Sequence, residues 1–226
     1  MKTAVLVDGA FYLKRHKAYF KKPLNDAQKV AKDLLNHCLK HIDKKNGERL
    51  YRIFFYDCPP VIKKMHHPIT NKAIDLGKSQ TAIFRNNLHN QLKQTRNVAL
   101  RLGYLDDSNG RWKIKDPDKE KRLLTGKLSR EDLEAADFIY YAVQKGVDMK
   151  IGLDIASLAH DRIVEKIVLI TGDNDFVPAA KYARRSGIEL ILDPMYKPIK
   201  IDLMEHIDGL NTTLPNKKEM EPNKAD

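Results

Sequence analysis

Short apolar runs that end near aspartates are the feature that most constrains what this chain can fold into. Residues 3–7 (Thr-Ala-Val-Leu-Val) stop at Asp8, and residues 166–171 (Lys-Ile-Val-Leu-Ile-Thr) are followed two positions later by Asp173. Short runs that are rich in β-branched residues and lack polar alternation are typical of strands buried on both faces. Strands of that kind belong to parallel sheets that helices cover on both sides.

Strand-like and helix-like patterns alternate along much of the chain. Apolar spacing predicts a helix from Asn25 to about His41, with Asn25 or Asp26 as its N-cap. Further elements are predicted over Leu50–Tyr56 (strand), 81–95 (helix), 129–144 (helix), 148 onward (helix), 177–185 (helix) and 188–192 (strand). The expected fold class is therefore α/β, a Rossmann-like parallel sheet with helices on both faces.

Residues 61–128 interrupt this alternation, and we expect them to form an insertion within one domain over residues 1–210. The polar, Pro-containing residues 211–226 predict a disordered tail.

Inside the insertion, the pattern predicts loops and one hairpin. Residues 61–80 predict a loop, and residues 115–127 predict a mobile loop. Two β-like runs, 98–105 and 111–115, flank Asn109-Gly110, and Asn-Gly is a favoured hairpin turn.

The net charge of +11 points to a polyanionic partner, because a basic excess attracts nucleic acid. Residues 85–130 contain twelve Lys and Arg against five Asp and Glu, whereas residues 131–175 are acidic on balance. A basic flank beside an acidic pocket suits a nuclease that binds both phosphate and a metal ion. A basic surface without a specific partner is the alternative that charge alone leaves open.

The compartment expected from the sequence is the reducing cytoplasm. No apolar run approaches the roughly 18 residues that span a bilayer. Asp8 interrupts the N-terminal apolar run, which therefore does not resemble a secretory signal. Cys38 and Cys58 follow no metal-ligand spacing and form no disulfide framework, so we interpret both as buried small hydrophobic residues.

Several carboxylates are expected at the edge of the sheet where the parallel strands end. Asp8 follows the first strand, and Asp173 and Asp175 follow the strand at 166–171. Ligands gather at the carboxyl ends of strands in open α/β sheets, and Mg²⁺ prefers oxygen donors. The alternatives are a turn at Asp8-Gly9 and helix N-caps at Asp173 or Asp175.

Two more carboxylates are candidates on the helix that starts near residue 148. Asp148 either contributes to the site or caps this helix. Asp154 lies in an otherwise apolar stretch, where a carboxylate is costly unless it is paired or binds a metal ion. It could instead face solvent beside Lys150.

Three sequence blocks resemble the signature blocks of NYN-domain (LabA-like) proteins, which belong to the PIN-like, FLAP-nuclease-related group. The blocks are Val7-Asp8-Gly9-Ala10-Phe11, Lys145-Gly146-Val147-Asp148 with Asp154, and Thr171-Gly172-Asp173-Asn174-Asp175-Phe176-Val177-Pro178. The resemblance implies a PIN-like sheet and a Mg²⁺- or Mn²⁺-dependent ribonuclease. It also implies Asp8, Asp148 and Asp173 as catalytic metal ligands, with Asp154 and Asp175 in support. Ala10 stands where many members have Asn.

The implied partner is single-stranded or structured RNA, held by a basic groove. The candidate RNA-binding residues are Lys14, Arg15, Arg85, Lys93, Arg96, Arg101, Lys113 and Lys115. Tyr12, Tyr104 and Trp112 could stack on bases, although each is more often a packing residue. The pair His66-His67 is interpreted as a solvated loop pair.

Two other functions remain open on the sequence alone. One is a regulatory module that binds RNA without cleaving it, and the other is a metal-dependent phosphatase. The absence of a Walker A motif and of a dinucleotide fingerprint disfavours a nucleotide-driven motor and a dehydrogenase. The sequence does not set the oligomeric state, and a homo-oligomer is compatible with it.

Overall fold

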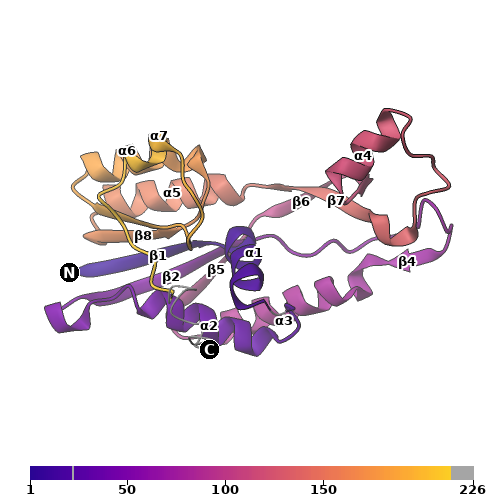
Figure 1. Cartoon of the computed structure of the whole chain (residues 1–226). Helices are drawn as coiled ribbons and strands as arrows, with labels where there is room; N and C mark the ends of the chain where they lie inside the picture. The colour runs from indigo at the N-terminus through magenta and orange to yellow at the C-terminus, as the bar shows by residue number, and fades with distance from the viewer. Residues whose placement is uncertain (22, 215–226) are drawn as a thin grey trace, which may run out of the picture.

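A six-stranded parallel sheet forms the centre of the protein in a computed structural model that describes residues 1–21 and 23–214 (Figure 1). The strand order is β10-β9-β8-β1-β2-β5. Their bounds are β1 Lys2–Asp8, β2 Arg49–Asp57, β5 Val98–Leu102, β8 Lys166–Ile170, β9 Glu189–Asp193 and β10 Gly209–Leu210. The expected parallel α/β sheet is confirmed.

The central strand β1 is buried on both faces, as its apolar run predicts. Successive side chains of a strand point to opposite faces. Ala4 and Leu6 accordingly pack into one apolar cluster, whereas Val5 and Val7 pack into the other. Hydrogen bonding to β2 on one side and β8 on the other leaves no free edge on β1.

Helices cover both faces of the sheet. The helices α1 (Gly9–Phe20), α2 (Ala27–Leu39) and α3 (Gln80–Gln94) pack on the face of Val5 and Val7. The helices α5 (Val147–His160), α6 (Val177–Arg185) and α7 (Ile201–Met204) pack on the face of Ala4 and Leu6. Short 3₁₀ turns lie at η1 Lys44–Asn46, η2 Leu76–Lys78, η3 Ala135–Asp137 and η4 Asn174–Phe176.

Residues 104–145, which we call the arm, project away from the sheet (Figure 1). Strand β6 (Tyr104–Ile114) pairs antiparallel with β7 (Phe138–Lys145), and α4 (Pro117–Leu124) lies at the far end. A small hairpin of β3 (Lys64–His66) and β4 (Ala73–Asp75) precedes α3. His67 attaches this hairpin to the arm, because its ring contacts Trp112 and its Nε2 lies 3.1 Å from the Ala135 carbonyl oxygen.

The predictions for this region were partly wrong. The run 98–105 does not form a hairpin with 111–115, because β5 joins the main sheet beside β2 and Asn109-Gly110 lies inside β6. The strand that pairs with β6 is β7, in a stretch predicted to be helical.

The helix predicted over 129–144 relied on a local contact that the structure uses differently. Ser129 does donate hydrogen bonds to Asp132, but this contact closes a turn and not a helix. Aromatic and β-branched residues then favour the strand. The predicted loops at 61–80 and 115–127 contain β3 with β4, and α4, respectively.

The first residues of the predicted disordered tail are bonded to the sheet domain. The Asn211 N–H donates to the Leu192 carbonyl oxygen, Thr212 donates to Asp193, and Leu214 is buried. The rest of the predicted tail, 215–226, lies outside the described residues.

Replacing Gly9 by alanine tests how tightly the end of β1 is packed. An added Cβ would lie 2.5 Å from the Tyr56 carbonyl oxygen and 2.7 Å from the Phe55 ring. We expect Gly9→Ala to lower the free energy of unfolding by about 1–3 kcal/mol, as overpacking does. Urea denaturation followed by circular dichroism measures the change.

Gly152→Ala in α5 is the matched control, because open space surrounds its added Cβ. It should raise the stability by about 0.5–1 kcal/mol through its higher helix propensity. Equal effects of the two substitutions would contradict the close packing at Gly9.

Candidate functional site

Asp8 links the ends of two neighbouring strands. It is the last residue of β1 and the N-cap of α1, where its Oδ1 accepts a hydrogen bond of 3.0 Å from the Phe11 N–H. Its Oδ2 accepts one of 3.3 Å from the hydroxyl of Thr171, which directly follows β8. The carboxylate is therefore held at the carboxyl edge of the sheet by one donor from the first turn of α1 and one from the residue after β8.

Asp173 and Asp175 lie on the turn that follows β8. The Asp173 N–H donates to the Thr171 Oγ1 at 3.2 Å, and the Asp173 Oδ1 accepts from the Asp175 N–H at 3.1 Å. Thr171 thus contacts both Asp8 and the backbone of Asp173. Asp173 caps the 3₁₀ turn η4, and both aspartates remain exposed to solvent.

Asp148 reaches the same region from a third segment. The N-cap of α5 is Gly146, which has a φ of +79°, so Asp148 is not the cap of its helix. Asp148 is exposed, and it lies in the first turn of α5, where the helix dipole favours negative charge.

The pKa values show that these carboxyls act on one another. Burial, together with the negative charges of Asp148 and Asp173, raises the pKa of Asp8 to about 6, against the hydrogen bonds from Phe11 and Thr171, which lower it. Burial, followed by the charges of Asp173 and Asp175, also raises the pKa of Asp148. Like charges that disfavour each other's ionised form lie close together.

Asp8 differs from the other aspartates that end strands of the sheet. The Asp57 carboxylate, at the end of β2, is paired with Arg85 at 3.1 Å and His89 at 2.8 Å. Asp193, at the end of β9, is paired with two histidines. Among the described residues, no basic side chain forms an ion pair with Asp8, so its negative charge is not compensated by the protein.

These oxygen donors and their uncompensated charge fit a hard divalent cation. The fit is a loose one, because the ligand atoms of these aspartates do not all lie within 4.8 Å of one another. Within residues 1–21 and 23–214, His37, His41 and Asp193 form the only trio of acidic, histidine or cysteine residues that meets this limit. Mg²⁺ usually keeps several waters and binds through one or two carboxylates, so wider spacing suits it.

Asp154 is engaged away from these carboxylates. Its Oδ2 accepts hydrogen bonds from the Tyr56 hydroxyl at 2.8 Å and from the Arg101 Nε at 3.1 Å. Its charge is therefore already compensated, and Asp154 is not among the groups that shift the pKa of Asp8. Asp154 is therefore not placed as the metal ligand that the sequence predicted. It does not face solvent beside Lys150 either, because Tyr56 and Arg101 bind its carboxylate.

Most of the candidate RNA-binding residues have structural partners. Arg15 donates to the Met195 carbonyl oxygen, and Arg85 pairs with the buried Asp57. Arg101 pairs with Asp154, Lys113 lies 4.0 Å from the centre of the Tyr141 ring, and Lys115 donates to the Ala136 carbonyl oxygen.

The remaining candidates do not share one groove. Lys93 and Arg96 precede β5 and therefore lie near the amino edge of the sheet, opposite the carboxylates. Lys14 is exposed on α1. The expectation of one basic groove formed by all eight residues is wrong. Some of the candidates lie at the amino edge of the sheet, opposite the carboxylates, and others lie on the arm.

The aromatic candidates have different environments. Tyr12 is buried in the core, and Trp112 packs against His67 and Tyr140 within the arm. Tyr104 is 58% exposed, so it alone of the three presents a largely free ring. His67 is buried, contrary to its interpretation as part of a solvated pair, whereas His66 is exposed.

Two residues near the carboxylates were missed by the sequence argument. Thr171 was recognised only as the end of a strand, although its position directly before Gly172-Asp173 could have indicated its role. Lys197 donates from Nζ to the Gly172 carbonyl oxygen at 2.8 Å and lies over the Phe11 ring. No sequence motif marks Lys197, since only folding brings it there.

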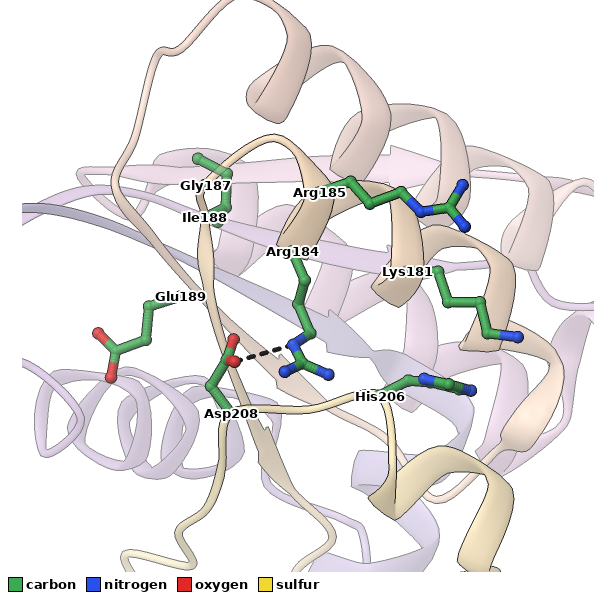
Figure 2. Close-up of a pocket in the computed structure, with 8 residues that line it drawn as sticks. All are labelled: Lys181, Arg184, Arg185, Gly187, Ile188, Glu189, His206 and Asp208. Carbon is green, nitrogen blue, oxygen red and sulfur yellow. Dashed lines mark hydrogen bonds and ion pairs between the residues drawn. The ribbon is translucent and has the colours of Figure 1, made fainter.

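Two cavities have walls that include none of Asp8, Asp148 and Asp173. A cleft of about 570 Å³ lies where the arm meets α3, lined in part by Pro60, Ser79 and Tyr141. An open pocket of about 920 Å³ gathers Lys181, Arg184, Arg185 and His206, with Arg184 paired to Asp208 (Figure 2). Because Glu189 begins β9, this basic pocket lies at the amino edge of the sheet.

The chain belongs to the NYN domain family, whose profile matches residues 65–202. Its sheet is accordingly that of a PIN-like, nuclease-type fold. A solved structure titled "Crystal structure of a protein of unknown function VPA0982 from Vibrio parahaemolyticus RIMD 2210633" is 14% identical, with a TM-score of 0.44, over 92% of this chain and 90% of that chain. No curated protein matches the sequence.

Within the described residues, no helix has the length and apolar character required to cross a bilayer. Cys38 and Cys58 are both buried and free, as their apolar surroundings predict.

Arg85 is expected to stabilise the fold and not to bind RNA. Arg85→Gln should lower the free energy of unfolding by about 3 kcal/mol, because it leaves the buried Asp57 with only His89 as partner. Lys14→Gln, at an exposed position, should stay within about 0.5 kcal/mol of the wild type. Urea denaturation decides the matter, and equal stabilities would contradict the role given to Arg85.

The raised pKa of Asp8 gives a pH dependence to the metal-free protein. The folded state keeps the proton up to about pH 6, whereas the unfolded chain loses it near 3.8. Stability in EDTA should therefore fall by about 1–3 kcal/mol as the pH rises from about 4 to about 6.5. Asp8→Asn preserves an N-cap acceptor for Phe11 and should remove this part of the fall. Denaturation at both pH values tests it, and an unchanged slope in the variant would exclude Asp8 as its source.

Proposed function

We propose that this protein is a divalent-metal-dependent ribonuclease with its centre at Asp8, Asp148 and Asp173. The observation that carries the proposal is that three distant segments bring carboxyls together, since the charges of Asp148 and Asp173 raise the pKa of Asp8 and the charge of Asp173 raises that of Asp148. A protein gains no stability from negative charges gathered without cationic partners. A binding role for a cation explains why they are kept together.

Mg²⁺ or Mn²⁺ is the cation that best fits the donors. Carboxylate oxygens suit these hard ions, whereas sites for softer metals use nitrogen and sulfur. In the proposed site Asp8, Asp148 and Asp173 hold the metal, and Asp175 adds negative charge beside them. Asp154 is left out, because Arg101 and Tyr56 already engage it.

The reaction proposed is hydrolysis of a phosphodiester bond. A divalent cation supplies a bound water of lowered pKa and offsets charge on the phosphate. The residues of the chain orient this centre: Thr171 fixes the Asp8 Oδ2, the Phe11 N–H fixes its Oδ1, and Lys197 fixes the Gly172 carbonyl group. No side chain has to act as a nucleophile.

RNA is the proposed substrate, because the net charge of +11 favours a polyanion and the NYN domain has a nuclease-type fold. The cleft between the arm and α3 begins just beyond the end of β2. Its wall includes Ile139 and Tyr141, which are about half exposed and offer apolar contact to bases. Free cysteines fit a reducing cytoplasmic location.

Cleavage of RNA should require both the metal and the carboxylates. Wild-type protein with Mg²⁺ or Mn²⁺ should cleave labelled RNA, and EDTA should abolish cleavage. Asp8→Asn and Asp173→Asn should each lower the rate by on the order of a hundredfold or more, because metal binding is weakened. Single-turnover assays on RNA and DNA measure these rates.

Asp202→Asn is the matched control. Asp202 is an exposed aspartate of α7, and it is not among the charges that shift the pKa of Asp8 or Asp148. It should cleave at the wild-type rate. Salt-sensitive RNA binding without cleavage would indicate a regulatory binding module, and turnover of a small phosphate ester alone would indicate a phosphatase. Either outcome would overturn the proposal.

A further inference from the structure

His37, His41 and Asp193 form a closed cluster at the carboxyl end of β9. His37 lies in the last turn of α2, His41 lies in the turn that directly follows this helix, and Asp193 is the last residue of β9. Their Nε2 atoms lie 2.7 and 2.9 Å from the same oxygen, Oδ2 of Asp193. All three side chains are at most 2% exposed.

The other oxygen of Asp193 is already saturated by the protein. Its Oδ1 accepts hydrogen bonds from the Met195 N–H at 2.8 Å and from the Thr212 hydroxyl at 2.9 Å. These contacts fix the carboxylate so that Oδ2 faces both imidazoles. Outer partners of this kind orient the ligating oxygen in metal sites.

Hydrogen bonds alone satisfy this cluster poorly. Two imidazoles share one carboxylate oxygen, and the Nδ1 atoms of His37 and His41 are buried without a hydrogen-bond partner among the described residues. His89 is another buried histidine, and its Nε2 lies 2.8 Å from the Asp57 Oδ2, which no second imidazole shares among the described residues. Neither ring nitrogen of His89 is buried without a hydrogen-bond partner. The sharing of one carboxylate oxygen by two imidazoles sets this cluster apart, because the singly paired His16 also has a buried Nδ1 without a partner among the described residues.

We propose that His37, His41 and Asp193 bind one transition-metal ion, with Zn²⁺ as the ion best suited to the donors. The end of α2 and the turn after it bring both rings to the same Asp193 oxygen, so their Nε2 atoms converge on one point. Two imidazole nitrogens and a carboxylate oxygen favour zinc over Mg²⁺, which prefers oxygen. The ligand atoms of this trio all lie within 4.8 Å of one another.

The geometry needs only a small adjustment to hold the ion. Tetrahedral ligands about 2.0–2.1 Å from zinc are about 3.3 Å apart, so each nitrogen would move about half an ångström from the Asp193 oxygen. The Thr213 hydroxyl, 3.5 Å from the His41 Nε2, lies next to the cluster, and a water or this oxygen completes four ligands. Burial without an open position makes the site structural and not catalytic.

Such an ion would fix three parts of the chain that only folding brings together. It would join α2 to the end of β9, and through Thr212 and Thr213 to residues 211–214. Asp193 also holds Met195, whose carbonyl oxygen accepts from Arg15 of α1. Two residues later, Lys197 contacts Gly172 beside Asp173. The site would therefore stiffen the loop that borders the carboxylates, whether or not they catalyse cleavage.

Zinc binding by the full chain tests the proposal. The starting protein carries Asp8→Asn and Asp173→Asn, so that the carboxylate edge does not hold metal, and is freed of metal with EDTA. It should bind one equivalent of Zn²⁺, measured by elemental analysis. A hundredfold excess over Kd should raise Tm by about 5–10 °C, as expected for ligand linkage in a chain of this size. Co²⁺ should replace Zn²⁺ and show the intense visible bands of a tetrahedral ion.

Two variants, with a third as control, assign the site. His37→Gln should lose the bound equivalent and the rise in Tm, whereas His89→Gln, which also removes a buried histidine paired with an aspartate, should keep both. His41→Cys keeps a metal ligand and should add a thiolate-to-cobalt charge-transfer band that the starting protein lacks.

Three results would overturn the proposal. They are no binding of zinc or cobalt at micromolar concentrations, an unchanged stoichiometry in His37→Gln, or one bound cobalt in His41→Cys without the thiolate band. Since the starting protein lacks two of the three proposed carboxylate ligands, these results are independent of whether the protein cleaves RNA.

Discussion

In the middle of the sheet, β1 is hydrogen-bonded to β8 on one side and to β2 on the other, with Val7 opposite Ile170 in the first pairing. This parallel pairing brings Asp8 and Thr171 together at the same edge, although 163 residues separate them in the chain. Two apolar clusters, one on each face, keep the pairing in place. The negative charge at the edge is therefore held by the burial of β1, and the candidate catalytic centre depends on that burial.

Three aspartates end strands of this sheet, and each has a different environment. Asp57 is neutralised by Arg85 and His89 of α3, and Asp193 meets His37 of α2 and His41 of the turn after it. Both pairings tie a helix to the end of a strand and exclude water. Asp8 instead has neutral donors and acidic neighbours. The same residue type at the same edge thus stabilises the fold at two strands and leaves an uncompensated charge at the third.

The arm forms one wall of a cleft that lies just beyond the carboxyl end of β2. It departs from the sheet after β5, at Gly103, where an added Cβ would lie 2.5 Å from the Lys145 carbonyl oxygen on the returning strand. The two strands are therefore packed tightly at the base. Beyond them, His67, Trp112 and Tyr140 give the arm a small aromatic core of its own. The resulting cleft lies between the arm and α3, just beyond the end of β2.

The sequence by itself determined the parallel sheet, most of its strands and helices, and the placement of Asp8, Asp148 and Asp173 at ends of elements, because apolar runs and helical spacing are local patterns. It failed over 98–145, where the β6–β7 pairing joins segments about 30 residues apart and overrides local turn and capping patterns. Only the tertiary structure decided which charges are compensated. Arg85, Arg101 and Asp154 became structural partners, and His37, His41 and Asp193 met, because ion pairing depends on distances between segments that local patterns do not encode.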